Sequence, residues 1–126
     1  MILDNDNLMP IYVQIAEWLE NEILSGNIVS DEKIYSQYQL AEMFSINPAT
    51  AAKGLNILAS ENILYKKRGL GMFVFLDARE VIKEKRKTQT LKTLTLNLVI
   101  EAKRLDLGEK EILDMVSKVI QESREG

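Results

Sequence analysis

The sequence predicts a mainly α fold with one small β-hairpin (α+β), in which a winged helix-turn-helix domain is followed by a two-helix C-terminal dimerisation tail. Three observations predict it. Two short amphipathic helical patterns meet at a turn within residues 36–60, a glycine-containing hairpin pattern follows at 63–76, and a stretch without glycine or proline runs through 78–105. The change in composition after the hairpin divides the chain into a first domain, 1–76, and a helical tail, 77–126.

The composition is that of a small globular protein with few catalytic options. Of the 126 residues, 46% are apolar and 28% are charged, and there is neither histidine nor cysteine. The commonest general base, metal ligands and thiol nucleophile are therefore missing, and we expect no enzyme activity, no catalytic residue, no metal site and no cofactor. No apolar run approaches the roughly 18 residues of a membrane span, and no signal peptide opens the chain. We expect a cytoplasmic protein without a membrane partner.

The first strong helical pattern spans residues 10–25. Residues 1–9 before it are expected to form a short polar arm. Trp18 lies off the apolar stripe of this helix and is expected to be partly covered, and Gly26 supplies a stop. The stripe itself recurs at helical spacing and consists of Tyr12, Ile15, Ala16, Leu19 and Ile23.

The next two helical patterns form the predicted helix-turn-helix. Ser36 begins the first, over 37–44. Asn47 suits the N-cap of the second, over 48–60, because its side-chain oxygen can accept from an unpaired N–H of the first turn. Pro48 follows at the first helical position, where its missing N–H costs nothing. In such a motif the second helix enters the major groove of DNA.

The second helix of this motif has an inner and an outer face. Ala51, Leu55 and Leu58 follow helical spacing and are expected to face the core, whereas Thr50 and Lys53 lie off that face. The residues expected to contact DNA on the two helices are Ser36, Gln37, Tyr38, Asn47, Pro48, Ala49, Thr50, Lys53 and Asn56.

A β-hairpin is predicted directly after the motif, and in that position it is a wing. Residues 63–67 form its first strand, 68–71 its loop and 72–76 its second strand, and the glycines of the loop permit positive φ. The tip is expected to lie at the DNA backbone or minor groove. Its DNA-contacting residues are Lys67, Arg68 and Gly69.

The tail is predicted to be one long helix over 78–105, or two with a bend near 88–90, and a final helix over 109–122. Apolar residues alternate at three- and four-residue steps, as in a coiled-coil seam. Because such helices cannot cover their own apolar faces within one hairpin, we expect a symmetric homodimer. The expected interface consists of Leu91, Leu94, Leu98, Ala102, Leu105, Ile112, Val116, Val119 and Ile120.

The total charge argues against a nucleic-acid binder, whereas the placement of the cations favours one. The net charge is −3, and the first 76 residues hold five Lys or Arg against nine Asp or Glu. Lys53, Lys66, Lys67 and Arg68 nevertheless fall on the elements expected to face DNA, and local potential governs phosphate contact. Two alternatives stay open: a winged-helix protein-interaction module, and a small-ligand-sensing dimer without strong DNA binding.

At this point the chain resembles the winged-helix domain of the GntR family of bacterial transcription regulators over about residues 9 to 76. The short tail is similar to that of the YtrA subfamily. The resemblance implies a dimeric repressor of a transporter-type operon, which binds a palindromic double-stranded operator and responds to an unidentified small-molecule effector, if to any. The matching segments are residues 10–16 (PIYVQIA), 23–26 (ILSG), 40–41 (LA), 47–50 (NPAT) and 69–74 (GLGMFV).

The chain departs from the family where bases are read. The family's Pro-Ser-x-Arg before Leu-Ala is Tyr35-Ser36-Gln37-Tyr38 here, and the resemblance places another family arginine at Ala52. Base readout would then depend on Tyr38, Ala49, Lys53 and Asn56, with Ala49 able to meet a thymine methyl group. We expect an operator that is A·T-leaning or read through its shape.

Overall fold

The computed structural model describes residues 8–125 of the 126-residue chain. The chain folds as two compact units, Met1–Glu84 and Lys85–Gly126. The predicted N-terminal arm, residues 1–9, lies outside the described residues except for its last two positions.

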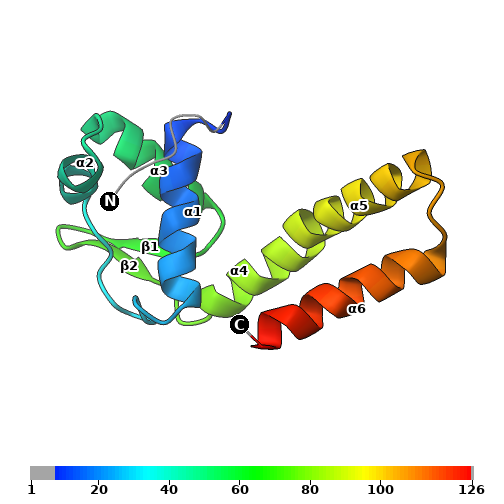
Figure 1. Cartoon of the computed structure of the whole chain (residues 1–126). Helices are drawn as coiled ribbons and strands as arrows, with labels where there is room; N and C mark the ends of the chain where they lie inside the picture. Colours follow the sequence, from blue (N-terminus) through cyan, green and yellow to red (C-terminus); the bar gives the residue numbers. More distant parts are fainter. Residues whose placement is uncertain (1–7, 126) are drawn as a thin grey trace. The chain divides into compact units, whose positions relative to one another are not determined.

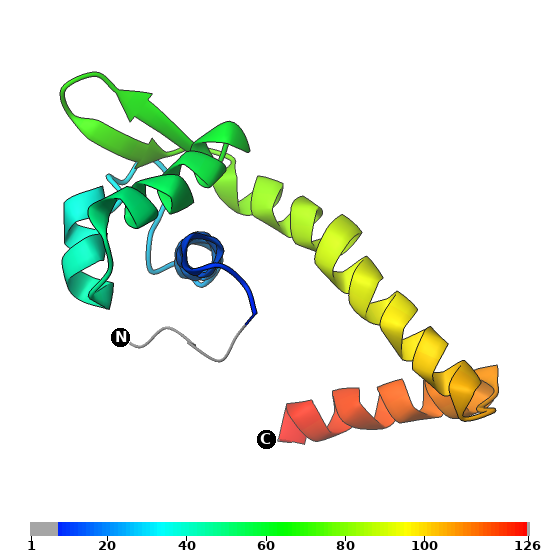
Figure 2. The same cartoon turned by 90° about the horizontal axis from the view of Figure 1, so that it is seen from above.

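The first unit consists of helices and one antiparallel β-hairpin (Figures 1 and 2). Leu64 lies opposite Val74 at the base of the hairpin, and Lys67 lies opposite Gly71 near its tip. The predicted mainly α fold with a small hairpin is confirmed. The elements are α1 (Ile11–Leu24), α2 (Gln37–Phe44), α3 (Pro48–Ser60), β1 (Leu64–Lys67), β2 (Gly71–Val74) and α4 (Ala78–Arg86).

The core of this unit forms around α3, which packs against α1, α2 and β1. Removal of apolar side chains from water is the main driving force for this packing. Trp18 is half-buried, with its ring centroid 5.1 Å from that of Phe44 and 6.0 Å from that of Tyr35, which confirms the predicted partial cover. The largest fully buried side chains are Ile15, Leu19, Leu40, Leu58, Ile63, Leu64, Val74 and Ile82.

Local sequence signals set the ends of the two middle helices. The Ser36 hydroxyl accepts from the backbone N–H of Gln39 over 3.1 Å, and the Gln39 side chain accepts from the backbone N–H of Ser36 over 2.8 Å. This reciprocal capping box satisfies two donors at the start of α2. Ser45 (φ 56°) and Asn62 (φ 61°) adopt the left-handed conformation after α2 and α3.

The first unit extends eight residues beyond the predicted boundary at residue 76. Ala78 and Ile82 of α4 are fully buried in its core. These two residues are four positions apart and therefore share one face of the helix. The burial of that face makes the start of the predicted tail a part of the first unit.

The second unit holds two helices. A π-helical turn, η1 (Lys87–Leu91), separates α4 from α5 (Lys92–Arg104), and α6 (Glu109–Glu125) follows. The predicted bend near residues 88–90 falls within the π-helical turn. The backbone N–H of Leu107 donates to the carbonyl of Ala102 over 2.9 Å and closes the connection between the helices.

The helices α5 and α6 diverge from their connection (Figure 2). Among the described residues of this unit, Ala102 is the one buried side chain. Apolar side chains along both helices consequently remain exposed to solvent. Within residues 8–125, no helix is long and apolar enough to cross a lipid bilayer.

Candidate nucleic-acid interface

The outer face of α3 is open to solvent over its whole length. Ala49, Lys53 and Asn56 are exposed, whereas Ala51 and Leu58 on the opposite face are completely buried. The two faces expected from the spacing are therefore present. Of the other predicted contact residues on this helix, Pro48 and Thr50 are half-buried.

The first turn of α3 is held by the predicted cap. The Asn47 side-chain oxygen accepts from the backbone N–H of Ala49 over 2.8 Å, and Pro48 occupies the first helical position. The cap uses the acceptor that Asn47 could offer to a base. Asn47 is thus occupied in fixing where α3 begins.

The start of α2 contributes a polar corner to the same motif. Tyr38 is 69% exposed, and within residues 8–125 its ring packs against no other ring and its hydroxyl neither accepts nor donates a hydrogen bond. Ser36 and Gln37 are half-buried, and the Ser36 hydroxyl is engaged in the capping box. Tyr38 is therefore the side chain of this corner with the greatest freedom to reach a base or a phosphate.

Lys53 has a neighbour that the sequence analysis did not anticipate. Its ammonium nitrogen lies 5.6 Å from the ring centroid of Tyr12 in α1. A cation at this distance from an aromatic face is attracted by the ring quadrupole. Tyr12 had been assigned to the apolar stripe of the first helix, and only the packing of α1 on α3 brings it to Lys53.

The hairpin carries cations at its tip. Gly69 (φ 78°) and Gly71 (φ 108°) adopt the backbone conformation that glycine tolerates best, which allows the tight connection. The Lys67 ammonium nitrogen lies 4.2 Å from the ring centroid of Phe73, and Arg68 is exposed. The predicted tip residues thus lie on one exposed loop.

One further lysine lies beside the hairpin and was missed. Lys33 forms an antiparallel bridge with Phe73 of β2, and its side chain is exposed. No helix or strand is predicted from the sequence for the segment before α2. No local periodicity could have revealed a pairing between residues so far apart in the chain.

The residues predicted for the dimer interface all lie in the second unit. Ala102 is buried and Ile112 is half-buried. Leu96 and Ile100 are two more exposed apolar side chains of α5, and they lie off the predicted seam. The remaining predicted interface residues are exposed: Leu91, Leu94, Leu98, Leu105, Val116, Val119 and Ile120.

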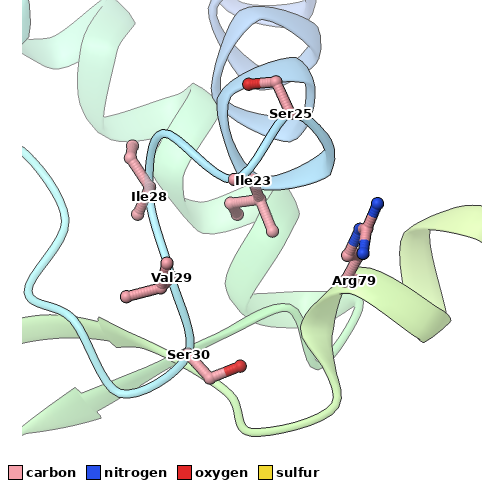
Figure 3. A pocket seen from close by; sticks show the side chains of 7 residues that line it. Ile23, Ser25, Ile28, Val29, Ser30 and Arg79 are labelled. Atoms are coloured by element: carbon pink, nitrogen blue, oxygen red, sulfur yellow. The ribbon is translucent and has the colours of Figure 1, made fainter.

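An open pocket of about 250 Å³ lies elsewhere in the first unit, between the end of α1 and the start of α4 (Figure 3). Ile23, Ile28, Val29 and Arg79 contribute to its lining. The Ser30 hydroxyl beside it donates to the carbonyl of Leu76 over 2.8 Å. None of the predicted DNA-contacting residues lines this pocket, so it is separate from the candidate interface.

Taken together, the capped and exposed α3, the preceding α2 and the basic hairpin define a winged helix-turn-helix domain of the DNA-binding class. A comparison with known protein families supports the same conclusion. The family described as "Bacterial regulatory proteins, gntR family" matches residues 11–74, about half of the chain. The chain belongs to the GntR family.

Two relatives of this chain are transcriptional repressors, and proteins of this class are not enzymes. The chain is 35% identical over 74 residues to the HTH-type transcriptional repressor NagR of Bacillus subtilis, and this match covers 59% of the chain and 30% of NagR. It is 29% identical over 100 residues to the HTH-type transcriptional repressor YtrA of the same species, covering 79% of the chain and 76% of YtrA. The chain thus spans less than a third of NagR but three quarters of YtrA.

Solved structures show the same fold. A transcriptional regulator of the GntR family from Bacteroides thetaiotaomicron is 32% identical, with a TM-score of 0.77 over 90% of this chain and 99% of that one. The DNA-binding domain of AraR, solved in complex with an operator, is 29% identical, with a TM-score of 0.55 over 59% of this chain and 94% of that one. The second match covers only the winged helix-turn-helix part.

Proposed function

We propose that this chain is a dimeric, sequence-specific repressor that binds double-stranded operator DNA. Helix α3 enters the major groove, and the hairpin lies along the backbone or the adjacent minor groove. The observation that carries this proposal is the solvent-exposed outer face of α3, with Ala49, Lys53 and Asn56, followed in the chain by a hairpin whose exposed tip carries Lys67 and Arg68. The AraR complex supports it, because a domain of the same fold binds an operator there.

The exposed apolar residues of α5 and α6 support pairing with a second copy. Burial of apolar surface contributes about 25 cal/mol per Å², so leaving this many large side chains in water is unfavourable. A symmetric pair covers the same patch on both copies. Two recognition helices then read half-sites about one DNA turn apart, which makes the operator palindromic.

The tail also favours a subfamily. The match to YtrA runs over 100 residues and therefore extends well beyond the family domain at 11–74. We assign the chain to a YtrA-like group and propose repression of a transporter-type operon. Its site of action is the cytoplasm, because bacterial DNA lies there.

A salt series tests the DNA-binding proposal. The chain is first used to select duplexes from a random DNA library, and affinity for a selected duplex is then measured by fluorescence anisotropy from low to physiological salt. We expect affinity to fall steeply with salt because phosphate contacts release counterions. Affinity that ignores salt would overturn the proposal and favour the protein-interaction module.

Lys53→Ala is the matching test of α3. We expect weaker binding to the selected duplex with unchanged thermal unfolding, because Lys53 is exposed and its removal leaves the core intact. Lys110→Ala, at an exposed position of α6, is the control. Equal affinities of the two variants would contradict the assignment of α3 to the major groove.

A second candidate function rests on a groove of about 430 Å³ between α5 and α6. Leu98, Val99, Ile112, Leu113 and Val116 line it, and Lys103 and Glu109 contribute charged groups. Ligand pockets typically combine an apolar lining with a few polar groups. A lipophilic effector that bound there would raise the melting temperature, and a tighter effector would raise it more at the same concentration, which a thermal-shift screen of such compounds measures.

A further inference from the structure

We propose that Lys33 is a further DNA-contacting residue, and that Lys33 and Lys67 together hold one backbone phosphate above Gly71. This inference rests on the proposed DNA-binding function and adds a contact from outside the predicted wing. It concerns the segment before α2, which passes beside β2 (Figure 1).

The backbone of this segment is fixed to β2 by an isolated antiparallel bridge. The backbone N–H of Ile34 donates to the carbonyl of Met72 over 2.9 Å. The N–H of Val74 donates to the carbonyl of Glu32 over 3.0 Å. Lys33 lies between these bonds and pairs with Phe73. Its position relative to the hairpin is therefore set by main-chain hydrogen bonds.

Pairing also fixes the face on which Lys33 projects. Residues that pair across neighbouring strands carry their side chains on the same face of a sheet. Tyr65 pairs with Phe73, and Phe73 pairs with Lys33. Two positions further toward the tip, Lys67 pairs with Gly71 on this same face. Lys33 and Lys67 thus flank the Phe73–Gly71 stretch of β2 from opposite sides.

Gly71 leaves space for the Lys33 side chain on the face of β2 that also carries Lys67. A Cβ atom at this position would lie 3.0 Å from Cε and 3.8 Å from the ammonium nitrogen of Lys33. The Lys33 side chain therefore lies over Gly71. Across the strand, the Lys67 ammonium nitrogen is 4.2 Å from the Phe73 ring centroid. The missing side chain of Gly71 allows both cations to gather above β2.

Neither cation is neutralised by the part of the chain that the structure describes. No ion pair is formed by Lys33 or Lys67 within residues 8–125. The carboxylate of Asp31, two residues before Lys33, accepts from the Tyr65 hydroxyl over 3.2 Å. That hydrogen bond holds the carboxylate at the base of the hairpin, whereas the lysines lie toward the tip.

A phosphodiester is the partner that fits this arrangement. Two neighbouring ammonium groups repel each other, and an anion with two accepting oxygens relieves that repulsion while receiving a hydrogen bond from each. Arg68 at the adjacent tip and the exposed face of α3 indicate which anion is present, because both are proposed to contact DNA. The lysine pair therefore adds a contact that fixes register without reading sequence.

The test compares Lys33→Met with Lys33→Arg. Methionine keeps the apolar stem that lies over Gly71 and removes the charge, whereas arginine keeps the charge. Lys110→Met in α6 is the matched control for loss of one exposed lysine. Affinity for a labelled mixed-sequence duplex is measured against salt concentration, with circular dichroism melting as the check on folding.

We expect Lys33→Met to make the slope of log affinity against log salt shallower by up to about 0.9 for each copy bound, the value of one whole phosphate contact, because Lys67 alone holds the shared phosphate less firmly. Between about 50 and 200 mM salt, that change makes the loss of affinity up to about threefold smaller per copy. Lys33→Arg and Lys110→Met should keep the wild-type slope. A wild-type slope in Lys33→Met, with a normal melting curve, would overturn the inference.

Two further outcomes separate this inference from the proposed function. If the affinity of the wild-type chain for the duplex falls steeply with salt and Lys33→Met shows the same slope, only the proposed contact of Lys33 and Lys67 with a phosphate is wrong. If the wild-type chain shows no salt dependence at all, both are wrong. Inorganic phosphate at matched ionic strength should not displace the duplex, and displacement that Lys33→Met abolishes would show a free-phosphate site instead.

Discussion

A Cβ atom at Gly54 of α3 would lie only 2.9 Å from the main-chain carbonyl oxygen of Tyr12 in α1. It would also lie 3.0 Å from the Cγ2 methyl group of Ile15. Real side chains essentially never come this close to a backbone oxygen, so the two helices touch through the bare backbone of Gly54. This contact fixes the depth at which α3 sits on α1.

Gly54→Ala should therefore destabilise the first unit. Alanine favours a helix, but here its methyl group must push α3 away from α1, and overpacking of this kind costs about 1–3 kcal/mol. The free energy of unfolding from urea titration measures the effect. Gly108→Ala is the matched control, because nothing lies within 4 Å of its added methyl group. A Gly54→Ala variant as stable as the control would contradict the close contact.

Tyr12 is expected to position Lys53. Tyr12→Leu should weaken binding to the selected duplex about two- to fivefold, corresponding to the 0.5–1 kcal/mol of an exposed cation–π contact. Tyr12→Phe keeps the ring and should bind like the wild type. In a Lys53→Ala background, Tyr12→Leu should cause no further loss, which a double-mutant cycle measures. An additive loss would show that the two residues act separately.

Asn47→Ala should lower stability through the lost N-cap. The hydrogen bond from the Ala49 N–H then has no side-chain acceptor, at a cost of about 0.5–2 kcal/mol. Asn47→Asp restores an acceptor and should recover most of that loss. The measurement is the melting temperature, monitored by circular dichroism. A DNA-binding assay would combine the effect of the lost cap with the effect of any lost contact between Asn47 and a base. Equal melting of the alanine and aspartate variants would show that the cap adds little.

Leu98→Asp should separate the proposed dimer. Leu98 belongs to the predicted seam and lines the groove between α5 and α6. A buried carboxylate without a partner is strongly unfavourable at such an interface. Thr93→Asp adds the same charge at an exposed position off the seam and should stay dimeric. Light scattering measures both masses, and a Leu98→Asp variant that remains a dimer would place the interface elsewhere.

The sequence could predict what local chemistry determines. Asn47 and Pro48 fixed the start of α3, and Ser36 fixed the start of α2, because caps act within one turn. The glycines at 69 and 71 likewise located the hairpin connection. Each of these signals lies within a few residues of the structure that it specifies.

The rest depends on contacts between distant segments. The bridge between Lys33 and Phe73, the approach of Tyr12 to Lys53 and the burial of Ile82 have no local signature. The same holds for Leu96 and Ile100, whose exposure follows from the way α5 and α6 diverge. The seam and the DNA-contacting face remain predictions.

The divergence of α5 and α6 links the number of paired chains to the level at which the chain is expressed. Since Ala102 is the one buried side chain among the described residues of the second unit, a lone copy gains little free energy by ordering its tail. On the proposed pairing, at low abundance the number of pairs grows with the square of the number of free chains, as mass action requires. Doubling the expression of the chain would then quadruple its pairs, and the cell would obtain a sharp threshold of silencing from the copy number alone.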